Sequence, residues 1–314
     1  MKKANWLALS IIVQGAASMV HADGWEPDTM ASNLVSEGIA ATRHNMTMSY
    51  LETTMPEALI FMGAVRNDYG AVCVYCHTPH GANNSSGMGM PLWNRTVNPS
   101  LTYVPYGTPT TLGLTVTNPG PASLTCLSCH DGATAIDSII NMPGSGMYLE
   151  SQETSVNTAS FLSAWPGPTV THYSLERCAS VCHGNSSSPA NFNNFVIGAG
   201  TGENGEYIEQ LGSTVDLRDD HPVGILYPTA FSSWTDFSPM DIEVPGQLAF
   251  FDDGNGRADI YEIRVYDSGD GFEVECASCH DPHGVPDAAN YKFIPSFLRV
   301  SNEASALCLT CHIK

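Results

Sequence analysis

All ten cysteines of this 314-residue chain lie in pairs, and a histidine follows each pair directly. Four pairs have the strict spacing C-x-x-C-H, and one has an extra residue between its cysteines. C-x-x-C-H is the attachment signature of haem c: two thiols form thioethers with the porphyrin, and the histidine binds the iron. A chain with five such motifs must fold around its cofactors. In chain order the motifs are Cys73, Cys76 and His77; Cys126, Cys129 and His130; Cys178, Cys182 and His183; Cys276, Cys279 and His280; and Cys308, Cys311 and His312.

Two other uses of paired cysteines have to be weighed. Exported proteins form disulfides, and C-x-x-C pairs also build zinc ribbons. Neither use needs a histidine after every pair, so the pattern favours haem. For the wider pair, Cys178 and Cys182, an unused pair or a disulfide remains an alternative, although the longer spacer still lets both thiols reach the porphyrin.

The N-terminus has the features of a secretory signal peptide. Lys2 and Lys3 precede an apolar run from Trp6 to Val20, and Ala22 is a small residue at the exit. We expect residues 1–22 to be the signal and residues 23–314 to form one multihaem domain. A retained membrane anchor is the alternative, and no later segment is long enough to span a bilayer. The predicted location is the cell surface or the extracellular space, with the periplasm as the alternative.

The chain is strongly acidic, with a formal charge of −20. Removal of Lys2 and Lys3 with the signal leaves ten basic residues against 32 acidic ones, a charge of −22. This charge argues against nucleic acid as a partner. It suits a cationic redox protein, a metal ion or a mineral surface, and it also serves simply to keep the protein in solution.

The histidine count matches the number of motifs. Without His21, ten histidines remain, and five of them belong to the motifs. The other five are His44, His80, His172, His221 and His283. We therefore expect five bis-histidine irons, each with one of these as its distal ligand. The alternatives are ordinary surface or core histidines, and methionines such as Met88, Met90 and Met142 as axial ligands.

Two of these histidines stand close to a motif. The sequences His77-Thr-Pro-His80 and His280-Asp-Pro-His283 both read H-x-P-H. The backbone holds the second histidine beside its own haem's proximal face, so it must reach the iron of another haem. We expect His80 to serve the haem of the second motif and His283 the haem of the last motif.

The predicted fold is mostly irregular, with short helices at the motifs and a haem-threaded core. The cofactors supply apolar surface that the Gly- and Pro-rich linkers lack. One regular element is expected outside the motifs. Residues 261–266 alternate with period two, and Gly269–Gly271 turns the chain into residues 272–275, which predicts a small β-hairpin.

An acidic segment before this hairpin resembles a calcium-binding loop. Asp253, Asn255, Asp259 and Glu262 are spaced around Gly256 as in an EF-hand. Phe251 occupies the first position of the loop and cannot bind an ion. Calcium and an ordinary acidic turn therefore both remain open.

The motifs as a set resemble a known family. The matching segments are CVYCHTPHG at 73–81, CLSCHDG at 126–132, DDHPVG at 219–224, CASCHDPHG at 276–284 and LCLTCHIK at 307–314, and residues 250–267 also fit. They are similar to the outer-surface multihaem cytochromes of metal-respiring bacteria that polymerise into filaments. The resemblance implies bis-histidine haems stacked in a continuous chain. It also implies a ligand near the N-terminus that reaches a haem of the next subunit, for which His44 is the candidate. Residues 133–218 depart from the family pattern.

The expected function is electron transfer without catalysis, since two histidines on every iron leave no position for a substrate. A multihaem oxidoreductase with one open haem, a discrete periplasmic electron shuttle and a structural surface protein are the alternatives. The partners we expect are further copies of the chain, other redox proteins and metal or mineral acceptors.

Overall fold

The computed structural model describes residues 38–47, 69–83, 92–95, 97, 101–106, 114–131, 136–137, 139–141, 214–218, 221–231, 236–287 and 292–313. The predicted signal peptide lies outside the described residues. So does the third motif, formed by Cys178, Cys182 and His183, together with the candidate ligand His172. No helix among the described residues has the length and apolar character that a membrane span requires.

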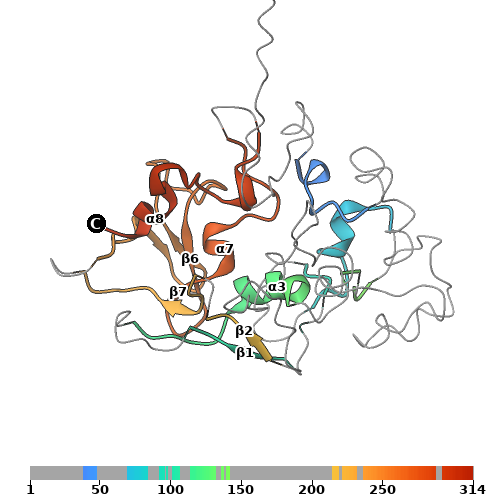
Figure 1. Cartoon of the computed structure of the whole chain (residues 1–314), viewed down its shortest axis with the longest axis horizontal. Coiled ribbons are helices and arrows are strands. Elements are labelled where there is room, and N and C mark those ends of the chain that lie inside the picture. The colour runs from blue at the N-terminus through green and yellow to red at the C-terminus, as the bar shows by residue number, and fades with distance from the viewer. Residues whose placement is uncertain are drawn as a thin grey trace, which may run out of the picture.

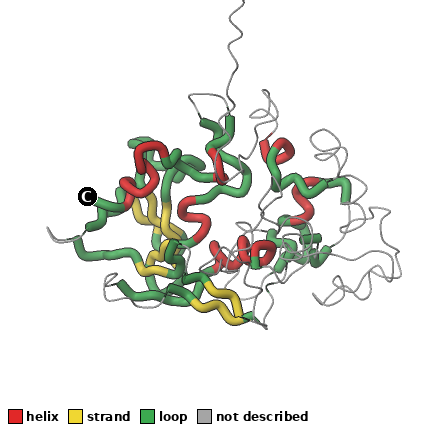
Figure 2. Tube along the Cα trace, viewed as in Figure 1, coloured by secondary structure: helices red, strands yellow, loops and turns green. Residues whose placement is uncertain are grey.

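Each described motif lies on a short helix. The four are η4 (Val72–Tyr75), α3 (Pro121–His130), α7 (Cys276–Cys279) and α8 (Ala306–Cys311). Figure 2 shows these helices as brief turns between long loops. At α7 and α8 the backbone becomes extended at the motif histidine, where φ/ψ is −112/143° for His280 and −95/130° for His312. Both histidines therefore leave the helix as it ends.

Three further 3₁₀ helices lie near candidate ligands or the last motif. They are η2 (Gly38–Ala41), η7 (Pro295–Phe297) and η8 (Glu303–Ser305). The longest helix among the described residues, α3, begins at Pro121 after an extended Gly120. Proline suits this first position because its fixed φ is helical and its missing N–H would have no partner there.

A five-stranded antiparallel sheet occupies the C-terminal half. Its order is β3 (Ile225–Leu226), β7 (Phe272–Val274), β6 (Arg264–Asp267), β5 (Leu248–Phe250) and β4 (Ile242–Val244). β6 and β7 form a hairpin in the region where the sequence predicts one, with Tyr266 opposite Glu273. The first strand begins at Arg264, three residues later than expected, because Tyr261 and Glu262 belong to the preceding acidic turn.

A second, two-stranded sheet pairs β1 (Thr102–Val104) with β2 (Thr214–Asp216) in parallel. Its Val215 packs with Leu127 of α3, and both side chains are fully buried. In Figure 1, α3 lies between the C-terminal part that carries the five-stranded sheet and the N-terminal part that carries η2 and η4.

The apolar core is divided into small clusters beside the motifs. Tyr69, Tyr75 and Ile139 pack with Cys76 at the first motif. Tyr227, Ala249 and Val265 pack with Cys311 at the last. The fold thus places a separate cluster next to the attachment residues of each end motif.

Candidate haem sites

The first motif is held by a strand-like segment that follows it. The Thr78 N–H donates to the Leu92 carbonyl at 2.8 Å, and the Asn94 N–H donates to the Cys76 carbonyl at 2.8 Å. The Asn94 side-chain amide also donates to the Val74 carbonyl at 2.7 Å. Residues 92–95 therefore support the backbone on both sides of His77.

Arg95 connects this segment to the second motif. Its side chain is fully buried and donates twice to the Ser128 carbonyl of α3, from Nε at 3.2 Å and from Nη2 at 2.6 Å. Nη1 donates to the Ile136 carbonyl at 2.8 Å. The two motifs approach each other here: burial raises the pKa of the Cys76 thiol to about 12, and the nearby Cys129 thiol adds to that rise.

The second and fourth motifs meet where α3 packs against α7. The Gly120 N–H donates to Glu275 Oε1 at 2.9 Å, the Ser123 hydroxyl donates to the same carboxylate, and the Cys276 N–H donates to Ser123 Oγ at 2.9 Å. A hydrogen bond with the Cys276 thiol is the largest cause that raises the pKa of Cys126 well above its ordinary value, and burial adds to it.

The fourth and last motifs are also neighbours. Burial raises the pKa of Cys279 to about 12, and the second-largest cause of this rise is the charge of the Cys311 thiolate. The Ser238 N–H donates to the Cys311 carbonyl at 2.9 Å, and the Phe237 ring lies 4.9 Å from the His312 ring. The four described motifs are thus arranged as a series in chain order: Arg95 joins the first to the second, Ser123 joins the second to the fourth, and the thiols of the fourth and last motifs influence each other electrostatically.

The third motif is outside this described series. Its attachment residues Cys178 and Cys182, its proximal candidate His183 and the distal candidate His172 all lie outside the described residues. A fifth haem at these positions therefore stays a prediction from the sequence. The second and fourth motifs are direct neighbours without it, because Cys126 contacts Cys276.

Histidine rings face each other across two gaps. The centroids of His77 and His283 are 6.2 Å apart, with an angle of 6° between the ring planes. Those of His44 and His130 are 6.3 Å apart, with an angle of 84°. In each pair one ring belongs to a motif and the other to the set of candidate distal ligands.

Several histidines carry a hydrogen bond that leaves the other ring nitrogen available. Nδ1 lies 2.8 Å from the Pro282 carbonyl in His44, 3.1 Å from the Pro222 carbonyl in His221 and 2.8 Å from the Ser296 carbonyl in His280. A carbonyl oxygen can only accept, so Nδ1 carries the hydrogen and the lone pair resides on Nε2. Metal-binding histidines are oriented in this way, and these residues therefore fit a role as iron ligands.

His283 has a charged partner instead. Its Nδ1–H donates to Asp281 Oδ1 at 3.0 Å, and Asp281 Oδ2 lies 3.1 Å from the buried guanidinium of Arg299. The hydrogen bond to Asp281 is the largest cause that raises the pKa of His283. For His44 the shift is opposite. Burial lowers its pKa to about 4, and repulsion from a charged His130 is the second-largest cause of this decrease.

The structure places some candidate ligands differently from the sequence-based expectation. His283 lies opposite His77 of the first motif rather than at the last motif, with ring centroids 6.2 Å apart. His44 lies near His130 of its own chain, where its ring bonds to Pro282 and stacks on Phe297 at 4.2 Å; a link from His44 to a neighbouring copy stays a prediction. His44 also occupies the position at the second motif that was expected for His80.

His80 and His221 are both exposed. The His80 carbonyl accepts a hydrogen bond from the Asn141 amide at 2.8 Å. His221 is close enough to His280 to contribute to the lowering of its pKa, of which burial is the main cause. The supporting roles of Arg95 and Arg299 have no sequence signal. Asp281 has one, because it stands between the two histidines of His280-Asp-Pro-His283.

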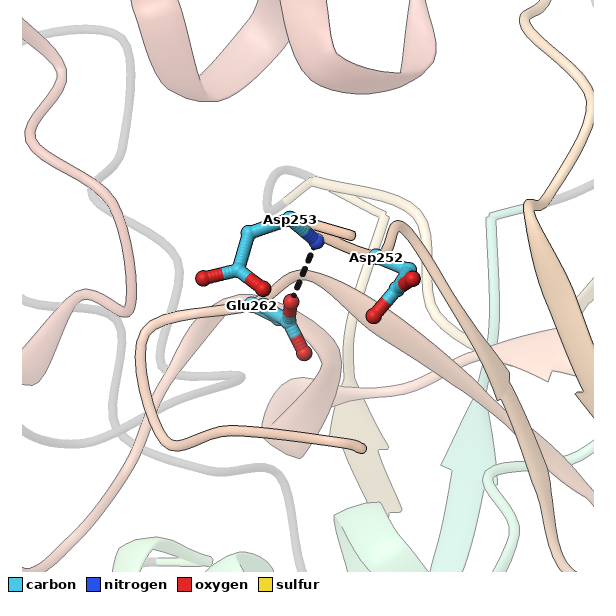
Figure 3. Close-up of side chains that lie close together, drawn as sticks. All are labelled: Asp252, Asp253 and Glu262. Carbon is cyan, nitrogen blue, oxygen red and sulfur yellow. Dashed lines mark hydrogen bonds between the residues drawn. The ribbon is translucent and has the colours of Figure 1, made fainter. Parts of the chain in front are cut away.

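The acidic loop brings together a different set of carboxylates from the one predicted. Ligand atoms of Asp252, Asp253 and Glu262 lie within 4.8 Å of one another (Figure 3). Asp259 is outside this group, and its carboxylate accepts from the Asn255 amide at 2.5 Å. Both Glu262 oxygens accept backbone N–H groups, from Asp253 and Asp259, at 2.8 Å each. Backbone amides therefore already satisfy the central carboxylate, as in an ordinary acidic turn.

A comparison with protein-family models matches residues 271–314 to the family described as doubled CXXCH motif. The matched region contains the fourth and last motifs. The match indicates motifs of the multihaem c-type cytochrome kind, with covalent binding of haem c. A comparison with curated proteins gives no match.

Proposed function

We propose that this chain is an exported electron-transfer cytochrome that carries five bis-histidine haems in series and passes respiratory electrons to acceptors outside the cell. The observation that carries the proposal is the serial arrangement of the described motifs: Arg95 bonds to the second motif beside the first, and Ser123 bonds to the fourth motif from the second. The thiols of the fourth and last motifs influence each other electrostatically. Haems attached to neighbouring motifs would be close enough to exchange electrons. The bound cofactors supply the redox chemistry, and the protein supplies position and axial ligands.

Exposure of the attachment residues agrees with entry and exit at the two ends of the series. Cys73 and Cys308 are exposed, whereas the six other described cysteines are partly covered. Leu309 and Ile313, beside the last motif, are exposed by 50% and 54%. The first and last sites are therefore the ones that a partner can approach.

The proposal includes assembly into a filament, which rests on the resemblance of the motif set to filament-forming surface cytochromes. The ring of His44 lies 6.3 Å from that of His130 in the same chain, which makes a role within its own chain an alternative to the subunit link that the resemblance implies. In that case the contact between copies joins the exposed ends of the series.

A redox titration of the full-length exported protein tests electron transfer. We expect every haem to be reduced and reoxidised reversibly, and we expect neither form to bind carbon monoxide or cyanide. A five-coordinate fraction that binds either ligand would favour a multihaem oxidoreductase instead. Electron microscopy of the secreted fraction tests assembly: filaments are expected, and a uniformly monomeric protein would contradict that part of the proposal.

A further inference from the structure

We propose that His283 and His44 are the trans axial ligands of the irons bound by His77 and His130, and that the turn Asp281–His283 sets the first pair parallel and the second perpendicular. This inference rests on the proposed function, because it assigns individual ligands within the haem series. It makes the two sites distinguishable by spectroscopy.

The ring separations match an iron between two imidazoles. A metal–nitrogen bond to histidine is about 2.0–2.1 Å long. In a five-membered ring with bonds of about 1.33 Å, each atom lies about 1.1 Å from the centre. Two imidazoles on opposite sides of one metal therefore have centroids about 6.2–6.4 Å apart. The observed separations are 6.2 Å between His77 and His283 and 6.3 Å between His44 and His130.

Direct contact would give a different distance. The His44 ring stacks on Phe297 with centroids 4.2 Å apart, which is the separation of rings in van der Waals contact. The parallel rings of His77 and His283 are 2 Å farther apart than that pair. The rings of His77 and His283 are thus not in van der Waals contact.

One turn orients the distal ligand of both sites. The Asp281 carboxylate accepts from His283 Nδ1 at 3.0 Å, and the carbonyl of the next residue, Pro282, accepts from His44 Nδ1 at 2.8 Å. Arg299 holds Asp281 in place through its 3.1 Å ion pair, and its Nε donates to the Ala277 carbonyl of α7 at 2.9 Å. A hydrogen bond on Nδ1 fixes both the tautomer and the rotation of a ligating ring.

The ring angles have an electronic consequence. Each imidazole interacts through its π orbital with the iron d orbital that lies perpendicular to the ring plane. Iron has two d orbitals that can interact with the imidazoles in this way. Two parallel rings act on the same one and separate the two d orbitals in energy, whereas perpendicular rings act on one each and keep their energies nearly equal. With an angle of 6°, the site of His77 and His283 should give a rhombic low-spin ferric signal. With an angle of 84°, the site of His44 and His130 should give a highly anisotropic one with a larger maximum g value.

Electron paramagnetic resonance of the oxidised full-length protein tests the assignment through single variants. We expect His283→Gly to remove one iron equivalent of rhombic signal and His44→Gly to remove one equivalent of the highly anisotropic signal, each with a gain of high-spin iron. The control is Arg218→Gly, which truncates an exposed side chain that is not a candidate ligand. It should leave both signals in place.

Haem attachment is checked in each variant by intact mass, because the thioether bonds do not depend on the distal ligand, and folding is checked by far-UV circular dichroism. Added imidazole should return the high-spin iron of His283→Gly and His44→Gly to low spin. The inference is overturned if His283→Gly keeps the whole rhombic signal, if Arg218→Gly removes part of it, or if His283→Gly and His44→Gly lose the same signal. Failure of the proposed function would look different, since the wild-type haems would then fail to cycle reversibly in the redox titration.

Discussion

Arg95 should contribute more to stability than any exposed arginine, because it is a buried connection between the first and second motifs. It donates three hydrogen bonds to two carbonyls, those of Ser128 and Ile136. Substitution of Arg95 by Met keeps the length of the side chain and removes all three donors. Each buried carbonyl that loses its hydrogen-bond donor lowers the stability by about 1–3 kcal/mol. Removal of the buried guanidinium also removes the penalty for keeping a charge away from water, which offsets part of this loss. We expect Arg95→Met to lower the free energy of unfolding by about 2–5 kcal/mol.

Arg218→Met is the matched control. The Arg218 side chain is 60% exposed and pairs with Asp216 at 2.5 Å, and a surface pair contributes about 0–1 kcal/mol. Guanidinium unfolding of the haem-loaded proteins, followed by haem absorbance and by far-UV circular dichroism, measures both changes. A loss for Arg95→Met that is no larger than the loss for Arg218→Met would refute the role of Arg95 as the bridge between the motifs.

Three further changes have defined outcomes. Burial raises the pKa of Glu275 to about 7, so the stability from its protonated form is present below about pH 4.5 and is lost as the pH rises through about 7. Relative to Glu275→Gln, the wild type should lose about 3 kcal/mol across this range in unfolding experiments. Asp281→Asn removes the negative charge beside His283. If His283 ligates an iron, as proposed, the potential of one haem should rise by about 20–60 mV in a redox titration, where about 59 mV is a tenfold change for one electron; unchanged potentials would argue against iron ligation by His283. Because backbone amides satisfy Glu262, calcium and EDTA should give the same melting temperature, and a rise with calcium would show an ion at Asp252, Asp253 and Glu262.

The sequence carries strong information about the attachment residues and little about how they are paired. The C-x-x-C-H motifs and the histidine tally are local patterns, and each described motif does lie on a short helix. The spacing in His280-Asp-Pro-His283 shows that His283 cannot bind the iron of His280. It does not indicate which of the other irons His283 would bind. The choice depends on contacts between segments about 200 residues apart, such as His77 and His283, which no local pattern contains.

The sheet shows a similar limit. The β6–β7 region has visible alternation and a glycine turn, whereas β3 has two residues and β4 and β5 have three each. Strands of this length are too short for a period of two to stand out. The acidic loop shows another limit: the spacing of Asp253, Asn255 and Asp259 fits an EF-hand, and their side chains bond to one another and to the turn backbone, contacts that spacing alone does not predict.

Haem content and iron coordination of the full-length exported protein test the central claim most directly. Intact mass together with the pyridine haemochrome assay counts the bound haems, and resonance Raman spectroscopy reports the ligation of each iron. We predict five covalently bound haems, all six-coordinate and low-spin in both oxidation states. Fewer than five haems, or any five-coordinate iron in the untreated protein, would contradict an electron-transfer chain built from bis-histidine sites.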